Sequence, residues 1–109
     1  MNLSIEKATL QFAADIKNTE IYKEYRKNLN NVKQDAELYE KTNEYRLKSF
    51  ELQTLEQTDD LLDKIDRLEQ EYGAIIDNPV ASDFLRAELS FCRMMQDINN
   101  CITTILDFE

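Results

Sequence analysis

The strongest constraint in this sequence is an apolar stripe close to its C-terminus. From Val80 to Phe108, apolar residues recur at alternating steps of four and three, and polar residues follow the same alternation on the opposite side. This spacing places each set along one side of a single α-helix. The stripe consists of Val80, Phe84, Ala87, Phe91, Met94, Ile98, Cys101, Ile105 and Phe108.

The predicted helix is long for so short a chain. About 29 residues give a helix of about 43 Å, because each residue adds 1.5 Å. A chain of 109 residues folding alone can cover only part of such a face. Neighbouring apolar residues also make the stripe wider than a two-stranded coiled-coil seam. We therefore expect helices of another chain to cover part of it, at an interaction face formed by Phe84, Leu85, Phe91, Met94, Met95, Ile98, Ile102 and Ile105.

Composition fixes the fold class. The chain contains one Gly and one Pro, too few to supply the turns that a strand-rich fold needs. We predict a single all-α domain over residues 1–109, an antiparallel bundle of long helices with a long C-terminal helix, assembled as a dimer.

Local signals divide this domain into three parts. Residues 1–33 should form N-terminal helices, with a break and a new N-cap at Asn18-Thr19. Residues 36–76 should form either a helical hairpin or one long helix, and Thr58-Asp59-Asp60 is a candidate cap within them. Asn78-Pro79 should start the C-terminal helix over residues 79–108, because Asn is a good N-cap and Pro suits the first helical position.

The charge is strongly acidic overall but unevenly distributed. A formal charge of −9 should repel free nucleic acid, so we expect none to bind the isolated protein. Residues 1–33, however, carry six Lys/Arg against four Asp/Glu. Their basic side chains form either a solvated helix face or a docking face for an anionic partner, such as RNA or the acidic half of another subunit. The candidate docking residues are Lys23, Arg26, Lys27 and Lys33.

Residues for catalysis or metal binding are scarce. The chain has no His, and a single Gly excludes a glycine-rich phosphate loop. Cys92 and Cys101 are nine positions apart, roughly 13 Å along a helix and on nearly opposite sides, so they cannot share one metal ion within the chain. We expect both to pack as small apolar residues, with ligation between subunits left open. We predict no enzyme activity, no catalytic residue and no cofactor.

The sequence also carries no sign of a membrane or secreted protein. No apolar run approaches the ~18–20 residues of a membrane span, and the first residues do not resemble a signal peptide. We expect a cytoplasmic protein with reduced thiols.

Three stretches resemble the YlbF/YmcA (YheA-like) family. They are the run from Asp77 to Leu89 continued by Met94-Met95-Gln96-Asp97-Ile98, the pair Ile21-Tyr22, and the helix start Asp35-Ala36-Glu37. The resemblance implies a cytoplasmic, non-enzymatic, all-α protein that forms dimers or larger complexes with related helical proteins. Better-known members act in a three-protein complex that supports competence, sporulation and biofilm formation and adjusts RNA processing by RNase Y. Some carry a cysteine-rich tail for iron–sulfur clusters; this chain shows none, so no cluster is expected.

These observations favour a regulatory adaptor that works by protein–protein contact through the C-terminal helix. Two other functions stay open: an RNA- or anion-docking helical accessory protein, and a structural or chaperone-like helical bundle. The partner and the pathway are not specified by the sequence.

Overall fold

A computed structural model describes residues 2–54 and 60–107 of the chain. Over these ranges the chain is all-α, as predicted, with no strand. The helices are α1 (Leu3–Lys17), α2 (Glu20–Lys33), α3 (Ala36–Thr54), α4 (Leu61–Glu71), the short α5 (Gly73–Ile76) and α6 (Pro79–Ile105).

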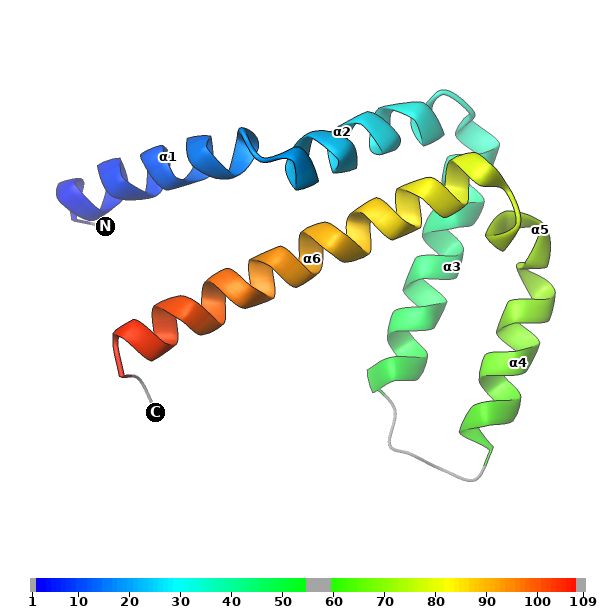
Figure 1. The fold of residues 1–109 in the computed structure, drawn as a ribbon. Helices are drawn as coiled ribbons and strands as arrows, with labels where there is room; N and C mark the ends of the chain where they lie inside the picture. Colours follow the sequence, from blue (N-terminus) through cyan, green and yellow to red (C-terminus); the bar gives the residue numbers. More distant parts are fainter. Residues whose placement is uncertain (1, 55–59, 108–109) are drawn as a thin grey trace.

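The helices form two arms that meet at an angle (Figure 1). In the long arm, α2 lies antiparallel to the first half of α6, and α1 extends beyond α2. In the short arm, α3 lies beside α4 and α5. The molecule measures 49 × 37 × 21 Å, so it is elongated, and among the described residues more large apolar side chains are exposed than buried.

The core lies where the two arms meet. Leu29 and Val32 of α2 contact Phe84 of α6, and all three side chains are buried. Half-buried side chains from α2, α3 and α6 surround them, namely Tyr25, Leu38, Tyr39 and Leu85. The first half of α6 is thus held inside its own chain.

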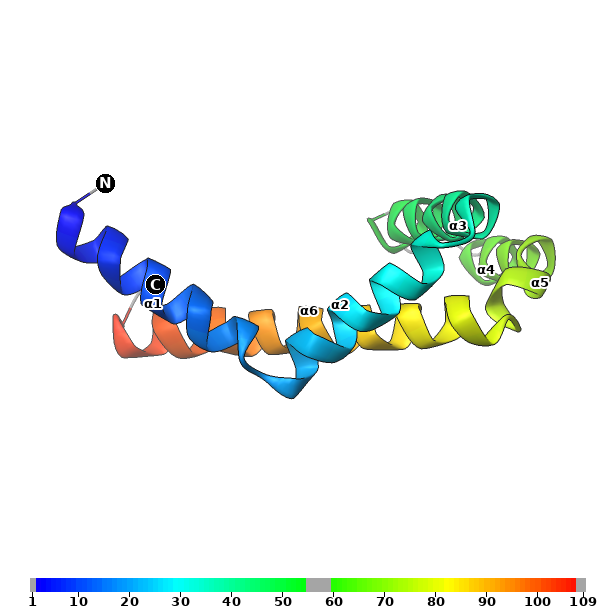
Figure 2. The same ribbon diagram turned by 90° about the horizontal axis from the view of Figure 1, so that it is seen from above.

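The break between α1 and α2 falls at the predicted position. Thr19 adopts an extended backbone, and its hydroxyl oxygen accepts a hydrogen bond from the Tyr22 N–H at 3.1 Å. The same hydroxyl donates to the Ile16 carbonyl at 2.7 Å, which ties the end of α1 to the start of α2. The chain changes direction at this cap, as Figure 2 shows from above.

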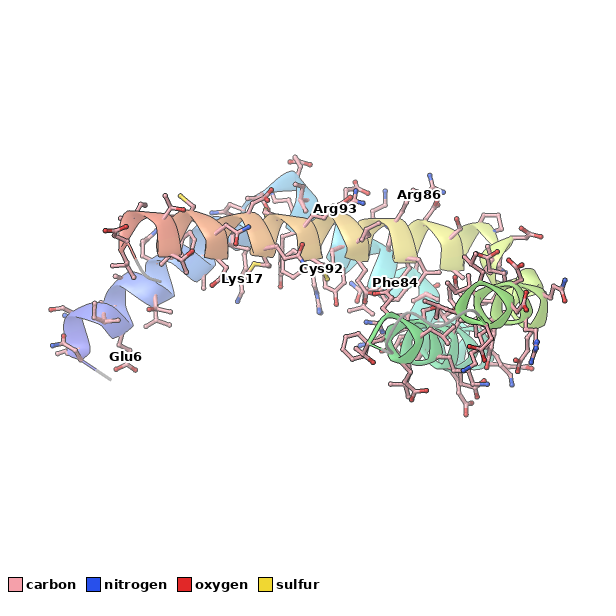
Figure 3. The ribbon with its side chains drawn as sticks, turned by 90° about the horizontal axis from the view of Figure 1, so that it is seen from below. Glu6, Lys17, Phe84, Arg86, Cys92 and Arg93 are labelled. Carbon is pink, nitrogen blue, oxygen red and sulfur yellow. The ribbon has the colours of Figure 1, made fainter. Side chains whose placement is uncertain are left out.

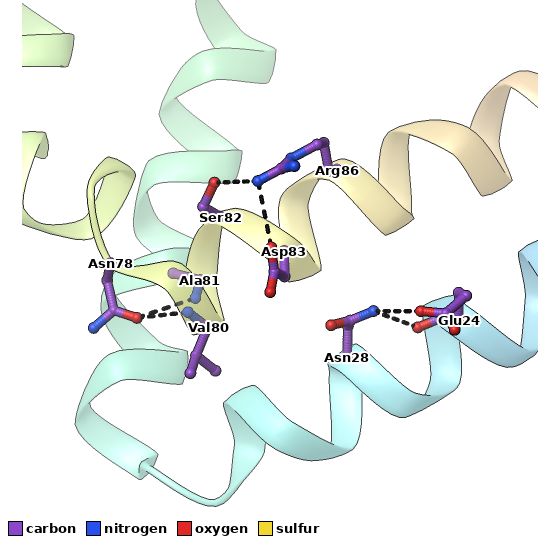
Figure 4. Close-up of polar contacts among 8 residues, drawn as sticks. All are labelled: Glu24, Asn28, Asn78, Val80, Ala81, Ser82, Asp83 and Arg86. Carbon is purple, nitrogen blue, oxygen red and sulfur yellow. Dashed lines mark hydrogen bonds and ion pairs between the residues drawn. The ribbon is translucent and has the colours of Figure 1, made fainter.

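The start of α6 is also where the sequence predicts it. The Asn78 side-chain oxygen accepts hydrogen bonds from the N–H groups of Val80 at 2.9 Å and Ala81 at 3.2 Å, and Pro79 occupies the first turn (Figure 4). Arg86 reaches back to Ser82, one turn earlier on the exposed side. The two hydrogen bonds to Asn78 satisfy backbone N–H groups that have no partner within the helix.

The helix ends slightly before the predicted limit. Leu106 caps α6, and Asp107 has a φ of 53°, in the left-handed region that stops a helix. The last residue of the predicted stripe, Phe108, lies outside the described residues.

The central segment is two helices side by side, which selects the hairpin over one long helix. The candidate cap residues Thr58 and Asp59 lie outside the described residues, and the Asp60 side chain makes no cap hydrogen bond to α4. The apolar spacing from Leu61 to Ile75 predicts one uninterrupted helix in the second half of this hairpin, but α4 ends at Glu71 and α5 begins after Tyr72. Tyr72 lies outside helical geometry, with φ −107° and ψ 21°.

Polar side chains hold the short arm together. The Tyr72 hydroxyl donates to Glu44 at 3.3 Å, and the rings of Tyr45 and Tyr72 lie 5.7 Å apart. Lys48 pairs with Glu71 at 3.4 Å. A hydrogen bond with Tyr72, and to a smaller extent the charge of Glu71, raises the pKa of Lys48 above its ordinary value.

One ion pair joins the two arms. Arg46 of α3 binds Glu88 of α6 with two nitrogens of its guanidinium. Nε donates a hydrogen bond to Oε1 at 2.8 Å, and the terminal Nη2 contacts Oε2. Asn43 accepts a second hydrogen bond from Arg46, whose guanidinium lies 5.4 Å from the centre of the Phe84 ring. A bidentate pair of this kind fixes orientation as well as adding energy, so it holds α3 at a defined angle to α6.

Among the described helices, none combines the length and the apolar character required to cross a membrane.

We predict that Asn78→Ala lowers the free energy of unfolding by about 1 kcal/mol, because α6 loses its N-cap. Urea unfolding at fixed protein concentration measures the change as a lower midpoint with an unchanged slope. Asn99→Ala, at an exposed site within α6, is the matched control and should change stability little. Equal effects of the two substitutions would contradict the role assigned to the cap.

Candidate interaction surface

The predicted interaction face divides into two parts. Phe84, Leu85 and Phe91 lie in the first half of α6 and face the chain's own helices. The Phe91 ring stacks on Tyr25 at 5.0 Å and meets Tyr22 edge-on at 5.7 Å, while Phe84 is 1% exposed. In Figure 3, Arg86 and Arg93 project from α6 away from Phe84. These three apolar side chains therefore pack within the chain, Phe84 fully and Leu85 and Phe91 in part.

The second half of α6 continues the same stripe, and its apolar side chains are only partly covered. Met94 and Ile98 are half-buried, whereas Met95, Ile102 and Ile105 are 39%, 43% and 76% exposed. The reason is length: α2 has 14 residues and α6 has 27, about 21 Å against about 40 Å. Helix α2 can accompany only the first half of α6.

Helix α1, which sequence reasoning did not include in the face, is equally uncovered. All of its residues except Ile16 are exposed. Its large apolar side chains include Leu3 and Leu10, which are 66% and 67% exposed, and Ile5 and Phe12 are exposed as well. The signal was present in the sequence, because five large apolar side chains in 15 residues exceed what a solvated helix needs.

The uncovered parts of α1 and α6 do not cover each other. Helix α1 contacts α2 but not α6, and Figures 1 and 2 both show it diverging from the C-terminal half of α6. We call the exposed large apolar side chains of α1 and of the C-terminal end of α6 the uncovered face. It consists of Leu3, Ile5, Leu10 and Phe12 of α1, Met95, Ile102 and Ile105 of α6, and Leu106 at the C-cap of α6.

The exposed area measures how open the chain is. The chain exposes 8568 Å², whereas a compact monomer of its mass exposes about 6,300 Å². Its radius of gyration is 17.5 Å, against about 13 Å for a compact domain of this length. Apolar patches that are large and contiguous mark interaction sites in soluble proteins.

The candidate basic docking residues lie together on α2. Lys23, Arg26, Lys27 and Lys33 are all exposed, and their spacing places them on one side of the helix. Two of them already have partners, since Lys23 pairs with Glu20 at 4.0 Å and Lys33 lies 5.6 Å from the centre of the Tyr39 ring. Among the described residues this leaves Arg26 and Lys27 as the cations best placed for an anionic partner.

The two cysteines are free and exposed on α6. Within the chain they do not pack as small apolar residues, contrary to our expectation; they could do so only in an assembly. The described part of the chain contains no group of three or more Cys, Asp or Glu side chains placed to hold a metal ion.

An open groove of about 590 Å³ lies between α3 and α4. Its walls are the stems of Lys48, Lys64 and Arg67, above Leu52 and Leu68. Lys48 and Lys64 are paired with acidic neighbours at 3.4 Å. The groove is the open space between two helices, lined by both apolar and charged side chains.

Comparison with known proteins identifies the family. A family model described as "Control of competence regulator ComK, YlbF/YmcA" matches residues 5–107. The chain belongs to the YlbF/YmcA family. The match confirms the resemblance noted in the sequence and links this YlbF/YmcA chain to the regulation of competence.

A curated relative supports this assignment. The chain is 29% identical to UPF0342 protein DSY2926 of Desulfitobacterium hafniense (strain Y51) over 102 residues, which covers 92% of this YlbF/YmcA chain and 82% of the relative. No solved structure matches the chain significantly.

We predict that Phe91→Ala lowers the free energy of unfolding by about 2–3 kcal/mol, because it removes a half-buried ring from the contact between α2 and α6. Leu89→Ala, on the same helix but 49% exposed, is the matched control and should cost no more than about 0.5 kcal/mol. Urea unfolding at one protein concentration compares the two. A Phe91 variant as stable as the control would contradict the internal role of this ring.

Proposed function

We propose that this chain is a non-enzymatic regulatory adaptor of the cytoplasm, acting by protein–protein contact through the uncovered face. By analogy with better-known members of the family, it would regulate competence, sporulation, biofilm formation and RNA processing by RNase Y. Its partners would be helical chains of the same or related sequence.

The observation that carries the proposal is the size of the apolar surface left open. Full burial of a large apolar side chain contributes about 1.5–3 kcal/mol. Eight partly exposed side chains on two helices could therefore contribute on the order of 10 kcal/mol before the costs of association. Interfaces owe most of their affinity to a few such apolar anchors.

Two features support a role without catalysis. Two open grooves lie between α3 and α4, the one described above and a second lined by Leu52, Leu61 and Ile65 among others, and both have mixed apolar, polar and charged linings. The family that matches the chain is a regulatory one. The RNA-docking alternative has less support, because the cations of α2 belong to a chain with a net charge of −9.

We predict that the double substitution Ile102→Glu with Ile105→Glu abolishes the regulatory activity, because two charges in the uncovered face cannot be buried without partners. The measurement is complementation in the native host after deletion of the gene, read as transformation frequency and ComK-dependent transcription. The wild-type chain should restore both.

The matched control is Leu62→Glu on α4, at a side chain that is 74% exposed and outside the uncovered face. This variant should complement as well as the wild type. Circular dichroism of the purified variants checks that helix content is unchanged. Full complementation by the double variant would place the function elsewhere, including in a purely structural role of the bundle.

A further inference from the structure

Helix α1 has apolar side chains on two nearly opposite sides. Leu3 and Leu10 are seven residues apart, two helical turns, and share one side. Ile5 and Phe12 have the same spacing and share the other side. All four are exposed, although a helix that is apolar around its circumference is typical of a buried position between neighbours.

The chain itself supplies too little packing to explain α1. Helices of about 12–15 residues are marginal in water when isolated, and packing of an apolar face normally stabilises them. Helix α1 has 15 residues and no buried side chain. Among the described helices only α2 contacts it, so a helix from outside the chain must supply the remaining contacts.

The lengths of the helices indicate which helix from outside the chain could pack against α1. Helix α6 is longer than α2 by about 19 Å, and α1, with 15 residues, is about 22 Å long. The length of α1 therefore matches the part of α6 that α2 leaves open. The chain's own α1 is turned away from that part by the Thr19 cap, whose hydroxyl bonds both flanking helices.

We propose that α1 of a second copy of this chain packs on the uncovered part of α6, and that the exchange is reciprocal. The inference deepens the proposed function and rests on it, because it names the occupant of the uncovered face. A reciprocal pair has twofold symmetry and closes on itself, so each copy covers the other without further growth.

The exposed area is sufficient for such a pair. The chain exposes 8568 Å², roughly 2,250 Å² more than a compact monomer of its mass. A stable interface needs about 800 Å² from each partner. Covering α1 and the end of α6 on each copy would use part of this excess and leave the rest at the angle between the arms.

The charges of the two helices also allow α1 of one copy to approach the end of α6 of another. Helix α1 carries two acidic and two basic side chains, and the part of α6 beyond Ser90 carries one basic residue, Arg93, and one acidic residue, Asp97. Both surfaces are therefore neutral in a chain whose net charge is −9. Repulsion between acidic copies is weakest where these helices meet.

Thiol cross-linking between two differently marked copies tests the arrangement. One copy carries Cys92→Ser and keeps the exposed Cys101 of α6. The other carries Cys92→Ser, Cys101→Ser and one new thiol on α1, either Leu10→Cys or Phe12→Cys. The copies are mixed in urea, refolded together and treated with a short bismaleimide, because axes of packed helices lie about 8–10 Å apart.

The expected result is a covalent product containing one copy of each kind, with at least one α1 position linked at least tenfold more than a control. The control replaces the α1 thiol by Leu62→Cys on α4, which is exposed outside the uncovered face. Mixed product at the control level for both α1 positions would overturn the proposal. In a copy that carries Leu10→Cys together with Cys101, a product bridged within one chain would also overturn it.

This experiment separates the inference from the proposed function. Loss of the specific cross-link, with complementation still abolished by the Ile102→Glu and Ile105→Glu pair, would leave the adaptor but assign a different partner to its face. A specific cross-link with full complementation by that pair would leave the reciprocal dimer and contradict the adaptor.

Discussion

The structure depends on a mismatch of length between two helices of the same chain. Helix α6 spans 27 residues, and its main neighbour α2 spans 14. Because a helix gains most of its stability from packing of its apolar side, a helix twice as long as its neighbour is packed along only part of its length. The open shape of the chain follows from this mismatch.

The two halves of α6 consequently serve different purposes. The first half builds the core with Leu29 and Val32 through Phe84, and Arg46 fixes its angle to the short arm through Glu88. The second half keeps the same apolar spacing but is only partly covered, since Met94 and Ile98 are half-buried whereas Met95, Ile102 and Ile105 are exposed. This combination fits the proposed adaptor role, because a rigid internal half would position the half proposed to bind a partner.

Much of the fold could be predicted from local sequence signals. Asn78-Pro79 and Asn18-Thr19 determine helix starts through side-chain hydrogen bonds to nearby backbone groups, and such bonds depend only on adjacent residues. The continuous stripe of α6 was equally visible, because it depends only on spacing. The break at Tyr72 was missed, since the apolar spacing from Leu61 continues through it to Ile75.

The division of the apolar stripe of α6 into a covered part and an exposed part could not be predicted from local sequence signals. Whether Phe91 or Ile102 is covered depends on where α2 ends relative to α6, and that is a property of the folded arrangement. The Arg46–Glu88 pair joins residues far apart in sequence, and no local pattern marks it. The two apolar sides of α1 were present in the spacing of Leu3, Ile5, Leu10 and Phe12, but they gain meaning only once α1 is seen to contact α2 alone.

The mass of the protein in solution tests the central claim most directly, namely that another chain covers what this chain leaves open. Sedimentation equilibrium of the purified wild-type protein measures that mass without reference to shape. The account predicts twice the 12.9 kDa of one chain. A mass of one chain at every accessible concentration would contradict it.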